Sequence, residues 1–147
     1  MKTIILYYSI HHGNTKKLVD AIAAAHPESI TLLDVSKAGP RDLSGYDWIG
    51  AASGIYAGGF GKPMLEYLKE NLPAGKNVFL LYSSAMNMDN QSSSVRKVIE
   101  AKKCWVIGQY HCPGHNTFGP FKLMGGTSKG RPNKEDIDKA VAFYDSL

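Results

Sequence analysis

The sequence predicts an α/β protein built on a doubly wound, five-stranded parallel sheet with the strand order 2-1-3-4-5. Three observations predict this class: five short apolar runs recur along the chain, amphipathic stretches alternate with them, and the chain has 147 residues, the usual size of one domain. Runs rich in β-branched and aromatic residues are typical of strands that helices bury on both faces. We therefore expect residues 1–147 to form one domain with its own core.

The expected strands are the five apolar runs, which span residues 3–9 (TIILYYS), 29–35 (SITLLDV), 46–53 (YDWIGAAS), 77–84 (NVFLLYSS) and 104–110 (CWVIGQY). The connection over residues 35–46 lacks a clear helical pattern, and we expect only a turn there. The other connections are long enough for helices with right-handed crossovers, which make the strands parallel.

Apolar residues at helical spacing mark four expected helices. They are Leu18, Ile22 and Ala25 in the first helix, Leu65, Leu68 and Leu72 in the second, Val95, Val98 and Ile99 in the third, and Ile137, Ala140, Val141 and Tyr144 in the last. Asn133 is the expected N-cap of the last helix, because acidic residues follow in its first turn. Ligands of such sheets bind where the strand order reverses, between the first and third strands. The candidate site therefore comprises the loops over residues 9–15, 53–61 and 83–90.

Composition indicates an ordinary soluble protein, with 44% hydrophobic and 20% charged residues. No run reaches the roughly 20 apolar residues that span a bilayer, and the N-terminal residues lack the cleavage pattern of a signal peptide. We expect a cytoplasmic protein, without membrane insertion, that is a monomer or a weak dimer. Cys104 and Cys112 lie at the two ends of an expected strand, beyond disulfide reach, and are expected to be reduced.

The net charge of +4 arises in the second half of the chain. Between Gln91 and Lys134, Glu100 is the only acidic residue among eight basic ones. Two interpretations stay open: a docking face for an acidic partner or a phosphate group, and solvated lysines on helices and loops. Basic residues are not interleaved with aromatic ones in a stripe, so we do not expect nucleic-acid binding.

The first loop, residues 9–15 (SIHHGNT), has the features of a phosphate-binding loop. The N-terminus of a helix exposes backbone N–H groups that favour an anion, and the hydroxyls of Ser9 and Thr15 add donors. The loop lacks both the Gly-Lys-Ser/Thr ending of nucleoside-triphosphatase loops and the spaced glycines of dinucleotide-binding loops. The alternative is a helix cap with nothing bound.

The second loop combines glycines with the aromatic residues Tyr56 and Phe60. Glycines let the backbone approach a flat ligand, and an aromatic ring can stack on one. The alternative is a turn whose aromatic residues pack into the core. In the third loop, serines, Met86 and Asn87 either contact a ligand's polar edge or cap the next helix.

The first loop resembles the phosphate loop of the flavodoxins, which bind the phosphate of FMN through backbone amides and hydroxyls without a lysine or arginine. Ser9 and Gly13-Asn14-Thr15 match that loop, whereas His11 and His12 replace its usual short hydroxyl residues and the loop is one residue longer. The resemblance implies a flavodoxin-like fold with FMN as cofactor.

By this resemblance Tyr56 corresponds to an aromatic residue that flanks the flavin, and Gly58 or Gly59 to the glycine whose peptide responds to flavin reduction. Met86 would substitute for a second aromatic residue. The complete set of expected FMN-binding residues is Ser9, His11, His12, Gly13, Asn14, Thr15, Ser53, Gly54, Tyr56, Gly58, Gly59, Phe60, Ser83, Ser84, Met86 and Asn87.

The resemblance implies a low-potential electron carrier that serves a redox partner protein, and the positive charge favours an acidic partner. The small size and the lack of a separate nicotinamide domain favour this carrier. The alternative is an FMN-dependent NAD(P)H oxidoreductase that reduces a quinone or another small acceptor. His11, His12 and the long segment over residues 111–133 leave room for it.

Other chemistries have weaker support in the sequence. His111, Cys112 and His115 are zinc-ligand types, but no second paired-ligand motif completes a tetrahedral set. Cys112 as a nucleophile lacks a third orienting group, so an idle thiol is the preferred interpretation. We expect neither a metal site nor a catalytic side chain. Residues 111–133 are expected to form an ordered cover, either the outer wall of the flavin site or a partner surface.

Overall fold

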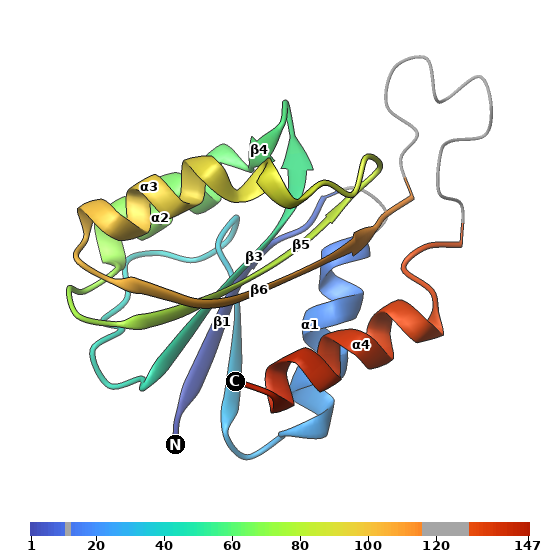
Figure 1. Ribbon diagram of the computed structural model, residues 1–147. Helices are drawn as coiled ribbons and strands as arrows, with labels where there is room; N and C mark the ends of the chain where they lie inside the picture. The colour runs from blue at the N-terminus through green and yellow to red at the C-terminus, as the bar shows by residue number, and fades with distance from the viewer. Residues whose placement is uncertain (11–12, 116–129) are drawn as a thin grey trace.

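A computed structural model of the chain describes residues 1–10, 13–115 and 130–147. These residues form a six-stranded sheet in which five strands follow the order β2-β1-β3-β5-β6 and β4 pairs with β3 alone (Figure 1). Neighbouring strands on that path are parallel. When these five strands are numbered in chain order without β4, their order is 2-1-3-4-5, which confirms the predicted class and strand order. The bounds are β1 Thr3–Tyr8, β2 Ile30–Asp34, β3 Trp48–Tyr56, β4 Gly59–Phe60, β5 Asn77–Ser84 and β6 Trp105–Pro113.

Helices cover both faces of the sheet (Figure 1). Helices α1 (Asn14–Ala25) and α4 (Lys134–Asp145) pack together on one face, and α2 (Lys62–Asn71) and α3 (Ser93–Ala101) pack together on the other. A short 3-10 helix, η1 (Asp89–Ser92), leads into α3. The connection between β2 and β3 contains turns and no helix, as predicted.

The alternation of side chains along each strand divides the core into two layers. Ile4 and Leu6 of β1 belong to the layer beneath α2 and α3, whereas Ile5 belongs to the layer beneath α1 and α4. In β5, Leu80 and Leu81 divide in the same way. Because both layers exclude water, the strands are apolar on both faces, which explains the nearly continuous apolar runs in the sequence.

Two of the predicted strand ends were wrong. Strand β3 continues to Tyr56 and turns into β4, so the predicted loop over residues 53–61 is mostly a hairpin in which Ile55 pairs with Phe60 and Tyr56 with Gly59. Strand β6 continues to Pro113 and includes the start of the predicted loop over residues 111–133. Both strands are longer than predicted because residues near their ends pair with the end of β5. Gly54 of β3 pairs with Ser83, and Pro113 of β6 pairs with Ser84.

The helices agree with the predicted apolar faces, except that Ala25 is exposed and Val19 is buried in its place. Asn133 caps α4 as predicted: its side chain accepts a hydrogen bond from the backbone N–H of Asp136 at 2.9 Å, and the Asp136 carboxylate accepts one from the N–H of Asn133 at 2.9 Å. In the part of the chain that the structure describes, no helix is long and apolar enough to cross a membrane.

Candidate functional site

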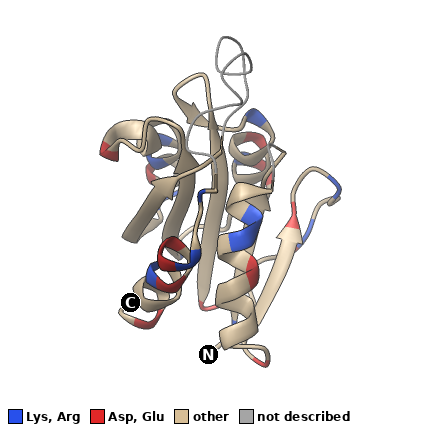
Figure 2. Ribbon diagram, turned by 90° about the vertical axis from the view of Figure 1, so that its right-hand side faces the viewer, with Lys and Arg blue, Asp and Glu red and all other residues tan. Residues whose placement is uncertain are grey.

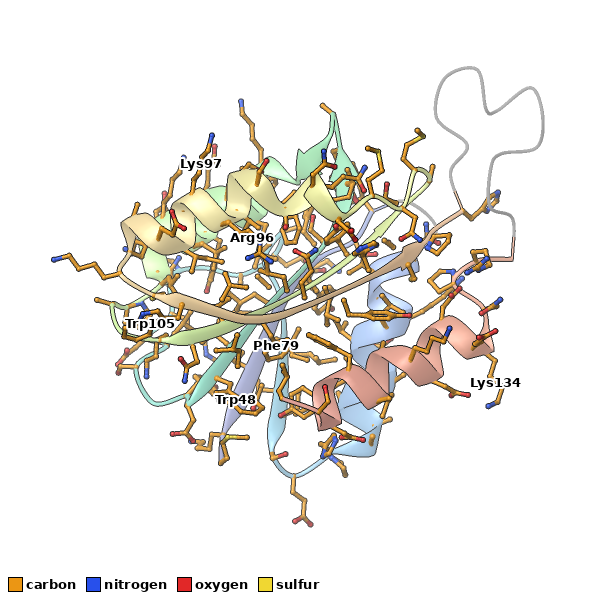
Figure 3. The ribbon with its side chains drawn as sticks, viewed as in Figure 1. Trp48, Phe79, Arg96, Lys97, Trp105 and Lys134 are labelled. Carbon is orange, nitrogen blue, oxygen red and sulfur yellow. The ribbon has the colours of Figure 1, made fainter. Side chains whose placement is uncertain are left out.

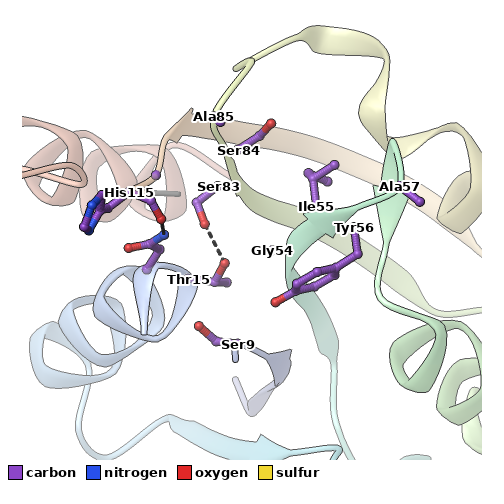
Figure 4. A pocket seen from close by; sticks show the side chains of 12 residues that line it. Ser9, Thr15, Gly54, Ile55, Tyr56, Ala57, Ser83, Ser84, Ala85 and His115 are labelled. Carbon is purple, nitrogen blue, oxygen red and sulfur yellow. Dashed lines mark hydrogen bonds between the residues drawn. The ribbon is translucent and has the colours of Figure 1, made fainter. Parts of the chain in front are cut away.

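A pocket of about 250 Å³ lies at the carboxyl ends of β1, β3 and β5, beside the N-terminus of α1 (Figure 4). This is the point where the strand order reverses, as predicted from the sequence. Ligand pockets typically begin at about 300 Å³, so this one has room for a small ligand or for one end of a larger one. The lining residues are Ser9, Asn14, Thr15, Gly54, Ile55, Tyr56, Ala57, Ser83, Ser84, Ala85, Gly114 and His115.

Hydroxyl groups line one wall of the pocket. The Thr15 and Ser83 hydroxyls share a buried hydrogen bond of 2.8 Å, which joins the first turn of α1 to the end of β5. The Ser9 hydroxyl accepts a hydrogen bond from the backbone N–H of Lys16 at 3.2 Å. A hydroxyl has one donor and two acceptor positions, so each of these groups keeps capacity for a further partner.

The start of α1 favours an anion. Gly13 precedes the helix in a left-handed conformation with φ of 63°, which glycine adopts without the penalty that a side chain brings. Among the described residues, none lies within 4 Å of the position that a side chain at Gly13 would occupy, so the backbone conformation rather than space requires glycine here. No acidic residue occupies the first turn of α1. The positive end of the helix dipole therefore faces this wall uncompensated.

Asn14 contains a buried acceptor atom without a partner. Its side chain is 7% exposed, and its Nδ2 donates to the backbone carbonyl of His115 at 2.8 Å. Its Oδ1 is buried and has no hydrogen-bond partner in the described part of the chain. An unsatisfied buried acceptor costs about 1–3 kcal/mol. A ligand that turns the Asn14 side chain toward the pocket would give this oxygen a donor.

Tyr56 forms the opposite wall. Its hydroxyl accepts a hydrogen bond from the backbone N–H of Ile10 at 3.3 Å, and its ring meets the Tyr8 ring edge-on, with 5.5 Å between the ring centroids. A side chain at Gly54 would come within 2.7 Å of the Tyr56 hydroxyl. The ring therefore lies directly over Gly54, and the glycine makes room for it.

The structure brings seven of the predicted site residues into the pocket lining: Ser9, Asn14, Thr15, Gly54, Tyr56, Ser83 and Ser84. His11 and His12 lie outside the described residues. Gly13 adjoins the lining as the residue before α1, and Gly58 lies in the turn of the β3–β4 hairpin with φ of 82°.

Other predicted residues lie elsewhere. Phe60 is 3% exposed and packs on Tyr82 in the core, because the hairpin turns its side chain away from the pocket. Ser53 holds the base of the hairpin, where its hydroxyl accepts from the backbone N–H of Gly61 at 3.0 Å. Gly59 pairs with Tyr56 in that hairpin and is not part of the lining.

Met86 and Asn87 belong to the loop after β5. The Met86 side chain is 67% exposed and does not line the pocket. The Asn87 side-chain oxygen instead contacts Nδ1 of His111 at 2.7 Å, and Nε2 of His111 contacts the Asp89 carboxylate at 2.6 Å. His111 also stacks on Tyr82, so its ring anchors this loop to β6.

Five lining residues were not among the predicted ligand contacts: Ile55, Ala57, Ala85, Gly114 and His115. Ile55 and Ala57 lie within the predicted second loop, at the end of β3 and in the turn that follows it. Gly114 and His115 come from the end of β6, where a side chain at position 114 would lie 2.9 Å from Nδ2 of Asn14. Both residues belong to the segment over residues 111–133, for which the sequence predicted either the outer wall of the site or a partner surface; residues 116–129 of that segment lie outside the described residues.

The described residues contain no group of three or more His, Cys, Asp and Glu side chains that could hold a metal ion. Cys112 is 2% exposed, and burial raises the pKa of its thiol to about 12. It is therefore protonated at neutral pH and is a poor nucleophile, which agrees with the preferred interpretation of an idle thiol.

Comparisons with known proteins point to one family. A family model described as a flavodoxin domain matches residues 4–115. An uncharacterized protein of Methanocaldococcus jannaschii is 34% identical over 149 aligned residues, covering 100% of this chain and 98% of the relative.

Solved structures with the same fold include several flavodoxins. An archaeal flavodoxin has a TM-score of 0.69 at 16% identity, covering 99% of this chain and 98% of that one. Flavodoxin 1 of Bacillus cereus has a TM-score of 0.63 at 15% identity, covering 99% of each chain. A Fusobacterium nucleatum flavodoxin bound to flavin mononucleotide has a TM-score of 0.61 at 16% identity, covering 99% of this chain and 98% of that one. With a family model that matches most of its length, this chain belongs to the flavodoxin domain family.

Proposed function

We propose that this protein binds FMN in the pocket beside α1 and carries electrons at low potential to a redox partner protein. The observation that carries the proposal is the polar wall formed by Asn14, Thr15 and Ser83, which lies where the positive end of α1 meets the reversal of the strand order. Membership of the flavodoxin domain family supports it, as does the FMN bound to the similar Fusobacterium nucleatum protein.

The residues present suit the two ends of FMN. The backbone N–H groups at the start of α1, with the Ser9 and Thr15 hydroxyls, would hold the phosphate. Asn14 Oδ1, which has no partner among the described residues, would accept from a hydroxyl of the ribityl chain or from a ring N–H. Tyr56 would cover a face of the flavin ring and exclude water from it. Bound FMN supplies redox chemistry that amino-acid side chains lack.

The chemistry of the lining favours a carrier over a reductase. Among the lining residues that the structure describes, which exclude His11 and His12, Tyr56 and His115 are the only ones with an ordinarily titratable side chain. A carrier needs its site to hold the cofactor and exclude water, and it needs few groups that exchange protons. We also propose that the chain works as one domain in the cytoplasm, because its two cysteines are free and buried and so fit a reducing compartment.

Two assays on the FMN-loaded protein test the carrier. The first mixes the dithionite-reduced protein with an oxidised acidic ferredoxin and follows the visible spectra of both. The second supplies NADH or NADPH with a quinone and follows nicotinamide absorbance. The proposal expects electron delivery in the first assay and no nicotinamide oxidation above the rate of free FMN in the second. Rapid NAD(P)H oxidation with the quinone would contradict the carrier and favour a reductase.

A further inference from the structure

A shallow groove runs between α2 and α3, on the face of the sheet opposite α1 and α4 (Figure 1). Its apolar floor is made by Leu65, Val98 and Ala101, and its polar residues are Ser93, Ser94, Lys69, Lys97 and Lys102. No acidic residue lines it, although Glu66, Glu70 and Glu100 belong to the same two helices. The groove therefore combines an apolar strip with an excess of positive charge.

Three lysines give the groove its positive charge. Neither Lys69 nor Lys97 has an ion-pair partner in the described part of the protein, and Lys97 projects from α3 away from the sheet (Figure 3). Lys102 Nζ donates to the backbone carbonyl of Lys69 at 2.9 Å, which places its ammonium group at the end of α2 and leaves two donors for another partner.

The other face of the sheet has a different charge pattern. Basic and acidic residues alternate along α1 and α4 there (Figure 2), and they form the i,i+4 ion pairs Lys16–Asp20, Lys134–Asp138 and Lys139–Glu135. The groove differs from this face because its lining contains three lysines and no acidic residue, although glutamates lie elsewhere on α2 and α3. It complements an acidic surface.

The groove and the proposed cofactor pocket flank the same hairpin. The Ser94 hydroxyl, at the groove's α3 wall, lies 2.9 Å from the position that a side chain at Gly59 would occupy. Gly59 pairs with Tyr56 across the hairpin, and Tyr56 lines the pocket. A partner seated in the groove would therefore rest against the structural element that also borders the pocket.

We propose that the α2–α3 groove is the docking site for an acidic, amphipathic helix of the redox partner. The apolar face of that helix would lie on Leu65, Val98 and Ala101, and its carboxylates would meet Lys69, Lys97 and Lys102. The redox role of this partner rests on the function proposed above, but docking itself requires no flavin. Binding weakens as salt increases, because the attraction is between exposed charges.

The test uses the full-length apoprotein and a synthetic helical peptide of about 20 residues with leucines on one face and glutamates on the other. Amide shifts in ¹⁵N NMR spectra locate the peptide, and their titration gives its Kd. One control peptide replaces every glutamate with lysine, and another replaces every leucine with serine. Lys97→Glu removes a groove charge, and Lys17→Glu makes the same change at an exposed lysine of α1 on the opposite face.

We expect shifts along α2 and α3 with the acidic peptide alone, and a Kd that rises about fivefold in Lys97→Glu but less than about twofold in Lys17→Glu. Equal weakening by both variants, or shifts centred on another face, would overturn the proposal. FMN uptake without peptide binding would refute docking while the cofactor proposal stands. Peptide binding at the groove without FMN uptake would support docking while the cofactor proposal fails.

Discussion

Thr15 and Ser83 lie 68 positions apart in the sequence, yet their hydroxyls share a buried hydrogen bond of 2.8 Å at the wall of the candidate site. This bond ties the first turn of α1, which would hold the phosphate, to the end of β5, which would lie beside the rest of the cofactor. The bond therefore helps to hold both elements in position around the ligand.

Replacing Thr15 with Val removes its hydroxyl but keeps its shape. The Ser83 hydroxyl then remains buried without its partner, so the free energy of unfolding should fall by about 1–3 kcal/mol. The double variant Thr15→Val, Ser83→Ala should recover much of that loss, because no polar group is left unsatisfied. Urea unfolding of the apoprotein measures the free energy of unfolding of the single and the double variant. Equal stability of the wild type and the single variant would show that the bond contributes nothing.

Gly13→Ala should destabilise the protein by about 1–2 kcal/mol, because a side chain is strained at φ of 63°. Gly45 has open space around it and no positive φ, so Gly45→Ala is a matched control that should leave stability nearly unchanged. We also expect Gly13→Ala to weaken FMN binding more than His11→Ala or His12→Ala does. The opposite order would point to histidine chemistry in the first loop.

Tyr56 and Phe60 have different roles although they lie four positions apart. Phe60→Ala should cost about 3–5 kcal/mol of stability, because its ring is 3% exposed in the core. Tyr56→Leu should cost less and should raise the Kd for FMN, because the Tyr56 ring lines the pocket. Thermal unfolding and flavin titration of both variants separate the two roles. If Tyr56→Leu bound FMN as tightly as the wild type, Tyr56 would have no part in the site.

Asp136 makes stability depend on pH. The Arg131 guanidinium, followed by the backbone N–H of Asn133, holds the pKa of the Asp136 carboxyl below its usual value, although burial opposes this. A carboxyl whose pKa is lower in the folded state stabilises the protein above its unfolded pKa, about 3.9, and loses that contribution as the pH falls through the folded value.

Asp136→Asn should therefore reduce stability by about 1–3 kcal/mol at neutral pH, and the difference from the wild type should shrink below about pH 4. Asp138→Asn alters an exposed carboxylate in the same helix and serves as the control. Urea unfolding across this pH range measures the effect. A difference that stays constant with pH would show that the carboxylate charge is not what stabilises the start of α4.

Local patterns in the sequence were sufficient to predict the five parallel strands of the sheet, but not β4. The apolar runs and the helical spacing located the five parallel strands, the most economical doubly wound topology placed them in the correct order, and acidic residues after Asn133 correctly marked the start of α4. The positions of Ser9, Asn14 and Thr15 in the pocket follow from the same reasoning, because residues just after a strand lie at the carboxyl edge of the sheet.

Features that depend on contacts between distant segments were not predictable. Glycines around Tyr56 suggested a loop, but pairing with a neighbouring strand and a short return strand makes a hairpin there. That hairpin decides that Phe60 enters the core while Tyr56 stays at the pocket. The contact between Asn14 and the carbonyl of His115 spans 101 positions, and no local pattern reports it.

The most direct test of the central proposal is a calorimetric titration of the apoprotein with FMN, using the wild type and Asn14→Leu. Asn14 Oδ1 is a buried acceptor without a partner in the described residues, and leucine keeps its approximate volume without that acceptor. We predict that the wild type takes up one FMN and that Asn14→Leu binds it about tenfold or more weakly, since a hydrogen bond of this kind is worth about 1–3 kcal/mol. A wild-type protein that takes up no FMN, or a variant that binds it equally well, would contradict the proposed site.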